Sequence, residues 1–382
     1  MKHVIVFGND HTNTVGVVQA LAKNGIDRID TLLYGEVTGY VKASKYVSHL
    51  YTAPNADLCV GLLLDNVIER KSDVVIIPCS DSAAIALYAN KERLQSKGFL
   101  CGGGIYKSTE VLSFFDKSTQ VKNANMVGFD VPISSVINDK SDLLQNKVYP
   151  CLIKPLVSAK GAKNQIRICR NYEELLKEYL SIGCSPNVIL QQYIDRDYEI
   201  SILGCALKDG TCVIPAVEEK LTLYPKLVGL ECLANIKPLT DGKIRDNISA
   251  LIKKIGYVGL FSVEMMHCKD DEKVYFTEIN LRNDGAQSFI LKYGVNLPLV
   301  HVYDLLGLPI PEFSDFFPGY YIWDMHHLKS LLSLDISIVQ WGKEILKSKG
   351  FLMYDKKDNG PFYRQYIYML KKCFNRKRVK SY

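Results

Sequence analysis

The sequence predicts an α/β protein with more than one lobe. Its N-terminal part alternates short apolar runs with helical patterns, an arrangement typical of a parallel sheet covered by helices. The later part carries strand patterns joined by short turns, which favours antiparallel pairs. With 382 residues the chain is too long for one simple core, so we expect two or three lobes.

The composition is that of an ordinary soluble globular protein, with 47% hydrophobic and 23% charged residues. We find no signal peptide, and apolar runs such as Val74–Cys79 are too short to span a bilayer. The 11 cysteines are scattered and lack C-x-x-C spacing, which argues against disulfides and zinc. We therefore expect buried inert thiols and a cytoplasmic protein.

The basic character lies in the C-terminal tail. The net charge is +6, and seven basic residues without an acid follow Pro361, which leaves +6 − 7 = −1 for the rest. A nearly neutral body does not suit nucleic acid, so no nucleic-acid partner is expected.

The N-terminal strands predict a ligand-binding edge. The expected elements are strands at His3–Phe7, Asp30–Tyr34 and Val74–Pro78, with helices after the first and third, the latter at Ala83–Leu94. Ligands of parallel sheets bind beyond the carboxyl ends of the strands, where Gly8–Asp10 and Ser80-Asp81 fall. Because G-x-G-x-x-G is missing, we expect a small polar substrate here and no dinucleotide.

The middle of the chain carries two features suited to phosphate. After a connector at Leu100–Lys107 and an expected helix at Ser108–Val127, a strand at Pro150–Pro155 contains Lys154. An ammonium group in an apolar strand needs an anionic partner. The following residues 157–163 are small and basic, so their N–H and ammonium groups could approach phosphates; the alternative is a solvated hairpin.

The strand predicted at Val274–Arg282 is the strongest candidate site. Its alternation places Glu278, Asn280 and Arg282 on one face, which suits a hard cation and a phosphate. The alternative is an ordinary edge strand with an incidental Glu–Arg pair. Glu264 lies on the preceding strand, and two neighbouring carboxylates repel each other unless a cation lies between them, which favours the metal interpretation.

The order of these features over about residues 1 to 311 resembles the ATP-grasp superfamily. It is similar above all to carboxylate–amine ligases such as D-aspartate ligase, and more distantly to carbamoyl phosphate synthetase. The strongest feature is Glu264 followed by Glu278-x-Asn280-x-Arg282. The resemblance implies a pre-ATP-grasp α/β domain at 1–107, a small lobe at 108–195, a large lobe with the metal site at 196–311, and a helical C-terminal extension at 312–382.

The resemblance also implies roles for individual residues. ATP and two Mg²⁺ ions are the expected cofactors, and Mn²⁺ is expected to substitute. The resemblance assigns catalysis to Arg282 and Lys154, and metal binding to Glu264, Glu278 and Asn280. It assigns ribose binding to Glu199 and a further phosphate contact to Lys220. The other residues expected to bind ATP are Lys117 and Lys154, the loop residues Ser158, Lys160 and Gly161, and the hinge residues Gln191, Gln192, Tyr193 and Ile194.

One departure from the family pattern concerns the hinge, which usually begins with glutamate. This chain has Gln191 and Gln192, whose amide oxygens can still accept from the adenine amino group. The substrate side matches no named ligase.

The implied reaction activates a carboxylate as an acyl phosphate, with release of ADP, and joins it to an amine. An amino acid is the expected carboxylate, in cell-surface polysaccharide or small-peptide synthesis. The alternatives are a carboxylase or formate-using transferase, and a nucleotide-binding module without catalysis.

The C-terminal extension ends in an expected helix. Tyr363, Tyr366, Ile367 and Leu370 follow helical spacing, and basic residues lie off that stripe. The helix either docks on the protein or lies on an anionic membrane surface. Peripheral membrane contact and a homodimer are the remaining hypotheses about partners.

Overall fold

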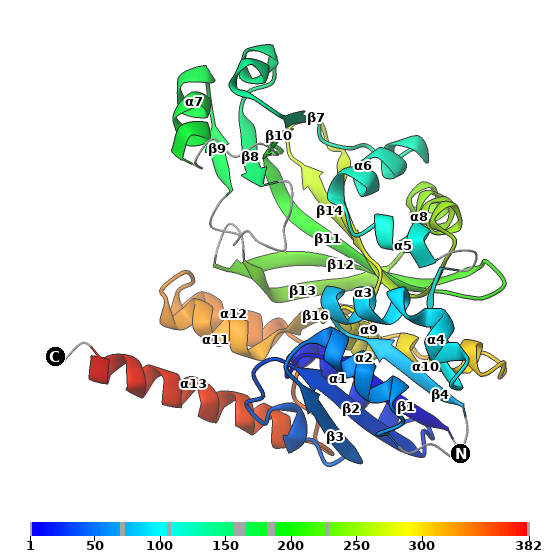
Figure 1. Ribbon diagram of the computed structural model, residues 1–382. Helices are drawn as coiled ribbons and strands as arrows, with labels where there is room; N and C mark the ends of the chain where they lie inside the picture. Colours follow the sequence, from blue (N-terminus) through cyan, green and yellow to red (C-terminus); the bar gives the residue numbers. More distant parts are fainter. Residues whose placement is uncertain are drawn as a thin grey trace. The chain divides into compact units, whose positions relative to one another are not determined.

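The computed structural model describes residues 2–68, 73–104, 108–155, 166–181, 188–225 and 229–379. The predicted α/β class is confirmed (Figure 1). The residues group into two compact units: the first contains 1–115, 201–263 and 279–382, and the second contains 116–200 and 264–278. The four domains predicted at 1–107, 108–195, 196–311 and 312–382 stay a prediction.

A parallel sheet forms the N-terminal part of the first unit, in the order β3-β2-β1-β4-β5. Its strands are β1 (His3–Gly8), β2 (Arg28–Tyr34), β3 (His49–Ala53), β4 (Val74–Pro78) and β5 (Phe99–Cys101). β1 and β4 are buried along their whole length, which is why they stand out in the sequence as apolar runs. β3 was missed because it is a half-exposed edge strand without clear alternation.

The helices of this part are interrupted where the sequence pattern predicted continuity. They are α1 (Thr12–Ala22), η1 (Val41–Ala43), α2 (Ala56–Leu64), α3 (Asp81–Ala89), α4 (Lys91–Gln95) and α5 (Ser108–Ser113). The predicted helix Ala83–Leu94 is divided at Asn90, whose side chain donates to the Ala86 carbonyl. The predicted helix Ser108–Val127 is also divided, because Asp116 is extended and caps the next helix.

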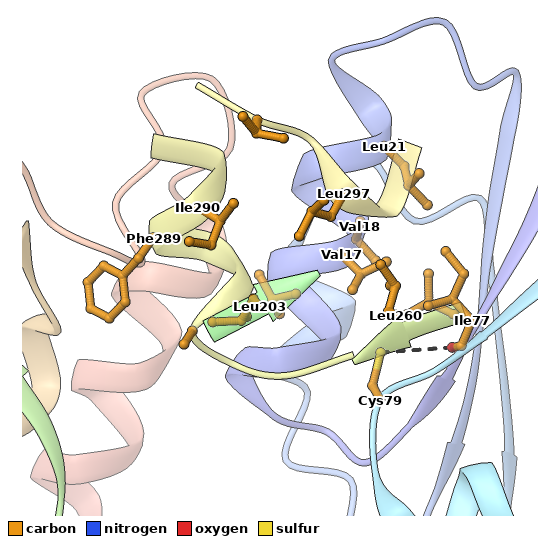
Figure 2. Packing of buried hydrophobic residues seen from close by; sticks show 14 of the residues in the cluster. Val17, Val18, Leu21, Ile77, Cys79, Leu203, Leu260, Phe289, Ile290 and Leu297 are labelled. Carbon is orange, nitrogen blue, oxygen red and sulfur yellow. Dashed lines mark hydrogen bonds between the residues drawn. The ribbon is translucent and has the colours of Figure 1, made fainter. Parts of the chain in front are cut away.

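The core of the first unit joins segments from distant parts of the sequence. α9 (Gln287–Tyr293) and α10 (Leu297–Leu305) pack against α1. Figure 2 shows residues of these helices that belong to one buried cluster: Val17, Val18 and Leu21 of α1, Phe289 and Ile290 of α9, and Leu297 of α10. Each of these side chains is fully buried, so this packing holds α9 and α10 against the N-terminal part of the first unit.

The second unit contains a smaller sheet in the order β7-β10-β8-β9, covered by α7 (Figure 1). Its elements are α6 (Lys117–Met126), β7 (Ser134–Ile137), η2 (Lys140–Gln145), β8 (Cys151–Pro155), β9 (Arg167–Cys169), α7 (Tyr172–Ser181) and β10 (Val188–Gln192). The predicted Asn171 cap of α7 is confirmed, since Asn171 Oδ1 accepts from the Glu174 N–H at 2.9 Å.

The largest sheet has the order β15-β14-β11-β12-β13-β16, with β6 also paired to β14. Its strands are β6 (Gly103–Gly104), β11 (Arg196–Ala206), β12 (Cys212–Tyr224), β13 (Leu230–Pro238), β14 (Tyr257–Cys268), β15 (Val274–Asn280) and β16 (Gly319–Ile322). β11, β14 and β15 each contribute residues to both units. The strand predicted to run to Arg282 ends at Asn280.

The helix α8 (Gly242–Ile255) precedes β14 and is defined at both ends by local chemistry. Asp241 Oδ1 accepts from the Ile244 N–H at 3.0 Å, and Gly256 ends the helix at a φ of 65°. That left-handed conformation favours glycine, so both ends could be predicted from the sequence.

The C-terminal extension contains α11 (Asp324–Leu332), α12 (Ile338–Lys347) and α13 (Gly360–Val379). Of the predicted apolar stripe, Tyr363 and Ile367 are 55% and 45% exposed, while Tyr366 packs against Phe362. The side chains of residues 370–382 lie outside the described part. None of the helices that the structure describes is long and apolar enough to cross a membrane.

Of the described cysteines, all are free and all except Cys212 are buried. Burial raises the pKa of Cys101 to about 12, so its thiol stays protonated at neutral pH. This agrees with an inert thiol at Cys101.

Candidate functional site

The first pair of predicted site residues meets at the start of α6. Asp116 caps this helix by accepting from the Thr119 N–H at 2.9 Å, and Lys117 follows it directly. Lys117 Nζ lies 2.7 Å from Glu278 Oε2 of β15, with side chains 37% and 32% exposed. A pair this accessible contributes at most about 1 kcal/mol, so an incoming ligand can replace it at little cost.

Lys154 of β8 lies beside this ion pair. Its Nζ donates to Gln191 Oε1 of β10 at 2.8 Å. Burial and the charge of Lys117 together lower the pKa of Lys154 to about 8, although the carboxylate of Glu278 partly offsets them. The two lysines and the carboxylate therefore influence one another, and a second negative group would stabilise the charged form of Lys154.

A cavity of about 520 Å³ opens at Lys117 and Lys154. Its lining includes Lys117, Val121, Phe129, Lys154, Ile189 and Gln191. Phe129 and Ile189 are buried apolar residues, whereas the lysines supply positive charge. Apolar walls with a few polar groups are typical of small-molecule sites, and this combination suits a ligand with a planar ring and phosphates.

The predicted hinge holds its neighbours through both glutamine side chains. Gln191 accepts from Lys154 and donates to Ser134 Oγ at 3.2 Å. Gln192 Oε1 accepts from the Ile133 N–H at 3.3 Å. The backbone N–H groups of Gln192 and Tyr193 donate to the carbonyls of Ile133 and Pro150. Adenine recognition by these two N–H groups would break existing bonds. The predicted role of the hinge in adenine binding therefore requires other groups, and it stays a prediction.

Ile194 and the first residues of the strand after it are anchored within the second unit. Ile194 packs in a small buried cluster with Cys268 and Tyr275. In β11, Glu199 Oε1 lies 2.9 Å from Arg196 Nε, and the Glu199 side chain is 20% exposed. The carboxylate predicted for ribose binding is thus oriented by a neighbouring cation, and its role stays a prediction.

Arg282 lies in the first unit in a network that the sequence did not predict. Its guanidinium donates to Asp81 Oδ1 at 2.9 Å, to Asp284 Oδ2 at 2.7 Å and to Asn280 Oδ1 at 3.1 Å. Burial lowers its pKa, but the carboxylates of Asp284 and Asp81 outweigh burial and raise it overall. Arg282 is therefore charged and fixed in direction.

Sequence reasoning missed Asp284 and gave Asp81 a different role. Asp284 follows Arg282 by two residues, a spacing that was the only local indication. Lys220 of β12 is also close, because it helps to lower the pKa of Asp284. The predicted phosphate contact of Lys220 stays a prediction.

Asp10, at the predicted ligand edge of the N-terminal sheet, orders a loop. Its carboxylate accepts from the N–H groups of Thr38, Gly39, Tyr40 and Val41 at 2.6–3.1 Å, and from the Thr38 hydroxyl. Five donors leave little capacity for a substrate. A ligand at this edge would have to use neighbouring groups.

The metal set stays a prediction. In the second unit, Thr277 Oγ1 donates to the Glu264 carbonyl at 2.8 Å. In the first unit, Asn280 Nδ2 donates to Ser262 Oγ at 3.2 Å. No three His, Cys, Asp or Glu side chains in the described ranges cluster to hold a metal ion. The predicted set has two carboxylates and one amide, so this finding does not bear on it. Ser158, Lys160 and Gly161 lie outside the described residues.

Comparison with known proteins identifies the domain around the cavity. Residues 122–290 match the family model described as the ATP-grasp domain. A formate-dependent phosphoribosylglycinamide formyltransferase from Francisella tularensis subsp. novicida is 30% identical over 191 residues, which cover 47% of this chain and 46% of that protein. The chain therefore spans about half the length of the curated relatives it matches.

Solved structures share the fold at low sequence identity. The biotin carboxylase domain of Hydrogenobacter thermophilus 2-oxoglutarate carboxylase, in complex with MgADP, ADP and bicarbonate, has a TM-score of 0.63 and 18% identity, over 84% of this chain and 73% of that chain. L-amino acid ligase from Bacillus licheniformis has a TM-score of 0.59 and 14% identity, over 80% and 74%. At these identities the likeness shows the fold alone.

Proposed function

We propose that this chain, whose residues 122–290 match the ATP-grasp domain, is an ATP-dependent, ADP-forming carboxylate–amine ligase. The observation that carries the proposal is the ion pair of Lys117 and Glu278 beside Lys154 at one cavity. Two cations and an exchangeable carboxylate offer what a triphosphate with a bound cation needs: charge for the phosphoryl oxygens and a ligand for the metal.

The residues present fit magnesium, because Glu264, Glu278 and Asn280 all offer hard oxygen donors. When bound, the metal would offset negative charge on the phosphoryl oxygens. Glu278 would then exchange Lys117 for the cation, and Lys117 would turn to phosphate. The pKa of Lys154 is lowered to about 8, so a fraction of its side chains is neutral near neutral pH. The same anion would raise that pKa and give Lys154 its full charge.

In the proposed reaction a carboxylate oxygen attacks the γ-phosphorus, the bond to the β-phosphate oxygen breaks, and ADP leaves. The amine nitrogen then attacks the acyl carbon, the bond to phosphate breaks, and an amide forms with loss of a proton. Positioning and electrostatic stabilisation supply the catalysis, so the chain needs no nucleophilic side chain. Arg282, held by Asp81 and Asp284, is the proposed contact for the transferred phosphoryl group.

A second candidate uses a one-carbon acid. The formyltransferases to which the chain is similar depend on formate, as their name states. Formate would enter the same reaction as the carboxylate, so the two candidates differ in substrate and share the ATP chemistry. A module without catalysis would bind ATP and release no ADP.

The decisive experiment measures ADP and phosphate release with Mg²⁺ and ATP over a matrix of carboxylates and amines. The matrix includes amino acids, formate and bicarbonate, with amino sugars and amino acids as amines. We expect release that requires both a carboxylate and an amine, and the active amine distinguishes cell-surface polysaccharide from small-peptide synthesis. Release with formate alone among the acids would favour the second candidate. ATP binding with no release in any combination would overturn the ligase proposal.

Two partner hypotheses belong to this proposal. A homodimer is expected to appear as twice the chain mass in sedimentation analysis. Peripheral contact of the basic tail with anionic lipid predicts that vesicle flotation is lost when residues after Gly360 are removed. Equal flotation of both forms would reject the lipid contact.

A further inference from the structure

Two buried cysteines lie directly opposite each other in the small sheet of the second unit. Cys151 begins β8 and Cys169 ends β9, and the antiparallel register of these two strands pairs the two residues. No C-x-x-C spacing links them in the sequence. Only the strand pairing brings them together, so the sequence alone gave no indication of the pair.

The pairing meets the distance that a disulfide requires. Residues opposite each other in an antiparallel pair have Cα atoms about 4.5–5.5 Å apart. Disulfides join residues whose Cα atoms are about 4.4–6.8 Å apart. Directly paired residues also share one face of the sheet, so both side chains leave the backbone on the same side. A bond between the two sulfurs therefore requires no movement of either strand.

Both thiols lie in the core between this sheet and α7 (Figure 1). Cys151 and Cys169 are 1% and 0% exposed and belong to one buried cluster with Leu175 and Tyr179 of α7. Lys154 lies in the same strand as Cys151, and the alternation of side chains places it on the opposite face. The pair therefore lies on the side of the sheet away from the proposed phosphate contact.

The two thiols are already in contact. The Cys169 thiol donates a hydrogen bond to the sulfur of Cys151. Asn146 Nδ2 donates to the same sulfur at 3.6 Å. Cys151 therefore accepts two hydrogen bonds, and the donor of one of them is the sulfur with which it would form a disulfide.

These contacts give the two cysteines different reactivity. The bond from Cys169 lowers the pKa of Cys151 in spite of burial, and the bond from Asn146 adds to the effect. The same thiol–thiol bond raises the pKa of Cys169, and burial and the nearby carboxylates of Glu178 and Glu174 raise it further. Because the thiolate is the reactive form of cysteine, Cys151 is the nucleophile of the pair.

Access to the pair comes from the edge of the sheet. β9 is the last strand in the order β7-β10-β8-β9, so its one strand neighbour is β8. The outer face of β9 is open to solvent, since Ile168 is 43% exposed. Edge strands open locally at a lower free energy than the interior of a sheet, and such opening admits a small oxidant to the sulfurs.

We propose that Cys151 and Cys169 form a redox-reactive pair, which hydrogen peroxide oxidises to a disulfide between β8 and β9. The Cys151 thiolate attacks one peroxide oxygen, the O–O bond breaks, and the leaving hydroxide takes up the thiol proton as water. The sulfur of Cys169 then attacks the resulting sulfenic acid at Cys151, the S–O bond breaks, and a second water leaves with the Cys169 proton. Two thiols and one peroxide thus give one disulfide and two waters.

The disulfide would restrain the sheet that carries the proposed ATP contacts. β8 pairs on its other side with β10, where Gln192 of the predicted hinge lies opposite Cys151. The bond would therefore hold β9 to the centre of the sheet and leave the face with Lys154 free. The inference goes beyond the proposed function and is independent of it, because the oxidation needs neither ATP nor a ligase substrate.

The test is peptide mapping by mass spectrometry of the full chain after treatment with a slight molar excess of hydrogen peroxide. We expect a peptide pair linked through Cys151 and Cys169, which dithiothreitol separates. Cys212 is the one described cysteine that is not buried, yet it should stay reduced, because burial of its sulfur still raises its pKa to about 11. Oxidation of Cys212 before the pair, or a disulfide between other cysteines, would overturn the proposal.

Variants test the two roles. Cys169→Ala leaves the nucleophile without a second thiol, so a sulfenic acid should persist at Cys151 and react with dimedone. In Cys151→Ala, oxidation of Cys169 should be at least about tenfold slower than oxidation of the pair, because its thiol stays protonated. The matched control is Cys212→Ala, which should form the disulfide like the parent chain. Parental oxidation of Cys169 in Cys151→Ala would contradict the assigned nucleophile.

A second measurement uses the parent chain alone and does not depend on how the variants fold. Hydrogen exchange at the backbone amides of β8 and β9 should slow at least about tenfold on oxidation, because the bond prevents separation of the two strands. Exchange at β1, in the first unit, is the internal control and should stay unchanged. Equal exchange of β8 and β9 in the reduced and oxidised chains would show that no bond joins these strands.

Discussion

The two cavities differ in how their polar groups are satisfied. Around the first cavity, the ammonium group of Lys117 has Glu278 and that of Lys154 has Gln191, so the site holds bonds that a ligand can replace. Around a second cavity, of about 380 Å³ in the first unit and lined in part by Tyr40 and Gln365, the atoms Tyr40 Oη and Gln365 Oε1 are buried without partners. The first cavity therefore presents polar groups that a ligand can reach, whereas the two unpartnered atoms at the second are buried beneath its surface.

This difference has a physical consequence. Exchange of an exposed ion pair costs little, so the first cavity can take up and release a charged ligand readily. A buried polar group without a hydrogen bond costs about 1–3 kcal/mol, so the two unpartnered atoms at the second cavity lower the stability of the fold around them. Nucleotide affinity should thus depend on charge and pH at the first cavity, whereas the buried polar groups near the second act on stability.

The largest effect is expected from Glu278→Gln. The variant keeps the shape but loses the negative charge that would hold the metal, so ADP release should fall by at least about 100-fold. The measurement is steady-state ADP formation with the best substrate pair. The matched control is Glu272→Gln on the hairpin after β14, 81% exposed at its side chain, which should keep parental activity. Parental activity in Glu278→Gln would reject the proposed metal role.

The next effect concerns Lys154. Its pKa is lowered to about 8, so the fraction of charged side chain in the ligand-free protein falls as pH rises through that value. Affinity for ADP should therefore weaken by up to about tenfold between pH 7 and pH 9. Lys154→Arg should remove this dependence, because guanidinium stays charged. Calorimetric titration of ADP at several pH values makes the measurement.

Lys177→Arg on the exposed side of α7 is the control and should keep the parental pH profile. An unchanged profile in Lys154→Arg would assign the pH dependence to another group.

The smallest effect is expected near the second cavity. Burial raises the pKa of Asp324 from 3.8 to about 6, although its Oδ2 accepts from the Met353 N–H at 3.0 Å. Because the folded pKa lies above the unfolded one, this group favours folding below pH 4 and loses that contribution as pH rises through 6. Asp324→Asn should raise the free energy of unfolding at pH 8 by about 1 kcal/mol.

The gain should vanish below pH 4, where the parental carboxyl is neutral in both states. Urea unfolding at pH 8 and pH 4 tests both points. A variant that is less stable than the parent at pH 8 would show that the charge of Asp324 is needed for the fold.

Much of the fold could be predicted because its signals are local. β1 and β4 are apolar runs, α7 and α8 have side-chain caps at Asn171 and Asp241, and Gly256 ends α8. The interruptions at Asn90 and Asp116 could not be predicted, since the side-chain bonds that decide them compete closely with helix continuation. The edge strand β3 could not be predicted because none of its five residues is fully buried, so it has no alternation of buried and exposed side chains.

The first cavity shows both outcomes for a site. Lys117, Lys154 and Glu278 were singled out by type and order in the sequence, and the structure brings them together. The use of Gln191 to accept from Lys154 was not foreseen. Asp284 was missed because its role is to accept a hydrogen bond from Arg282. That bond depends on the path of the chain after β15, which the sequence does not show.

The sequence by itself determined the α/β class, the apolar strands and the charged residues of the ATP-grasp domain, because periodicity, caps and residue order are written along the chain. Only the tertiary structure decided that Tyr40 and Gln365 line one cavity, because nothing local links residues 40 and 365. Their meeting depends on buried nonlocal bonds such as Gln19–Asp358, and on the packing of α1 against α9 and α10 (Figure 2).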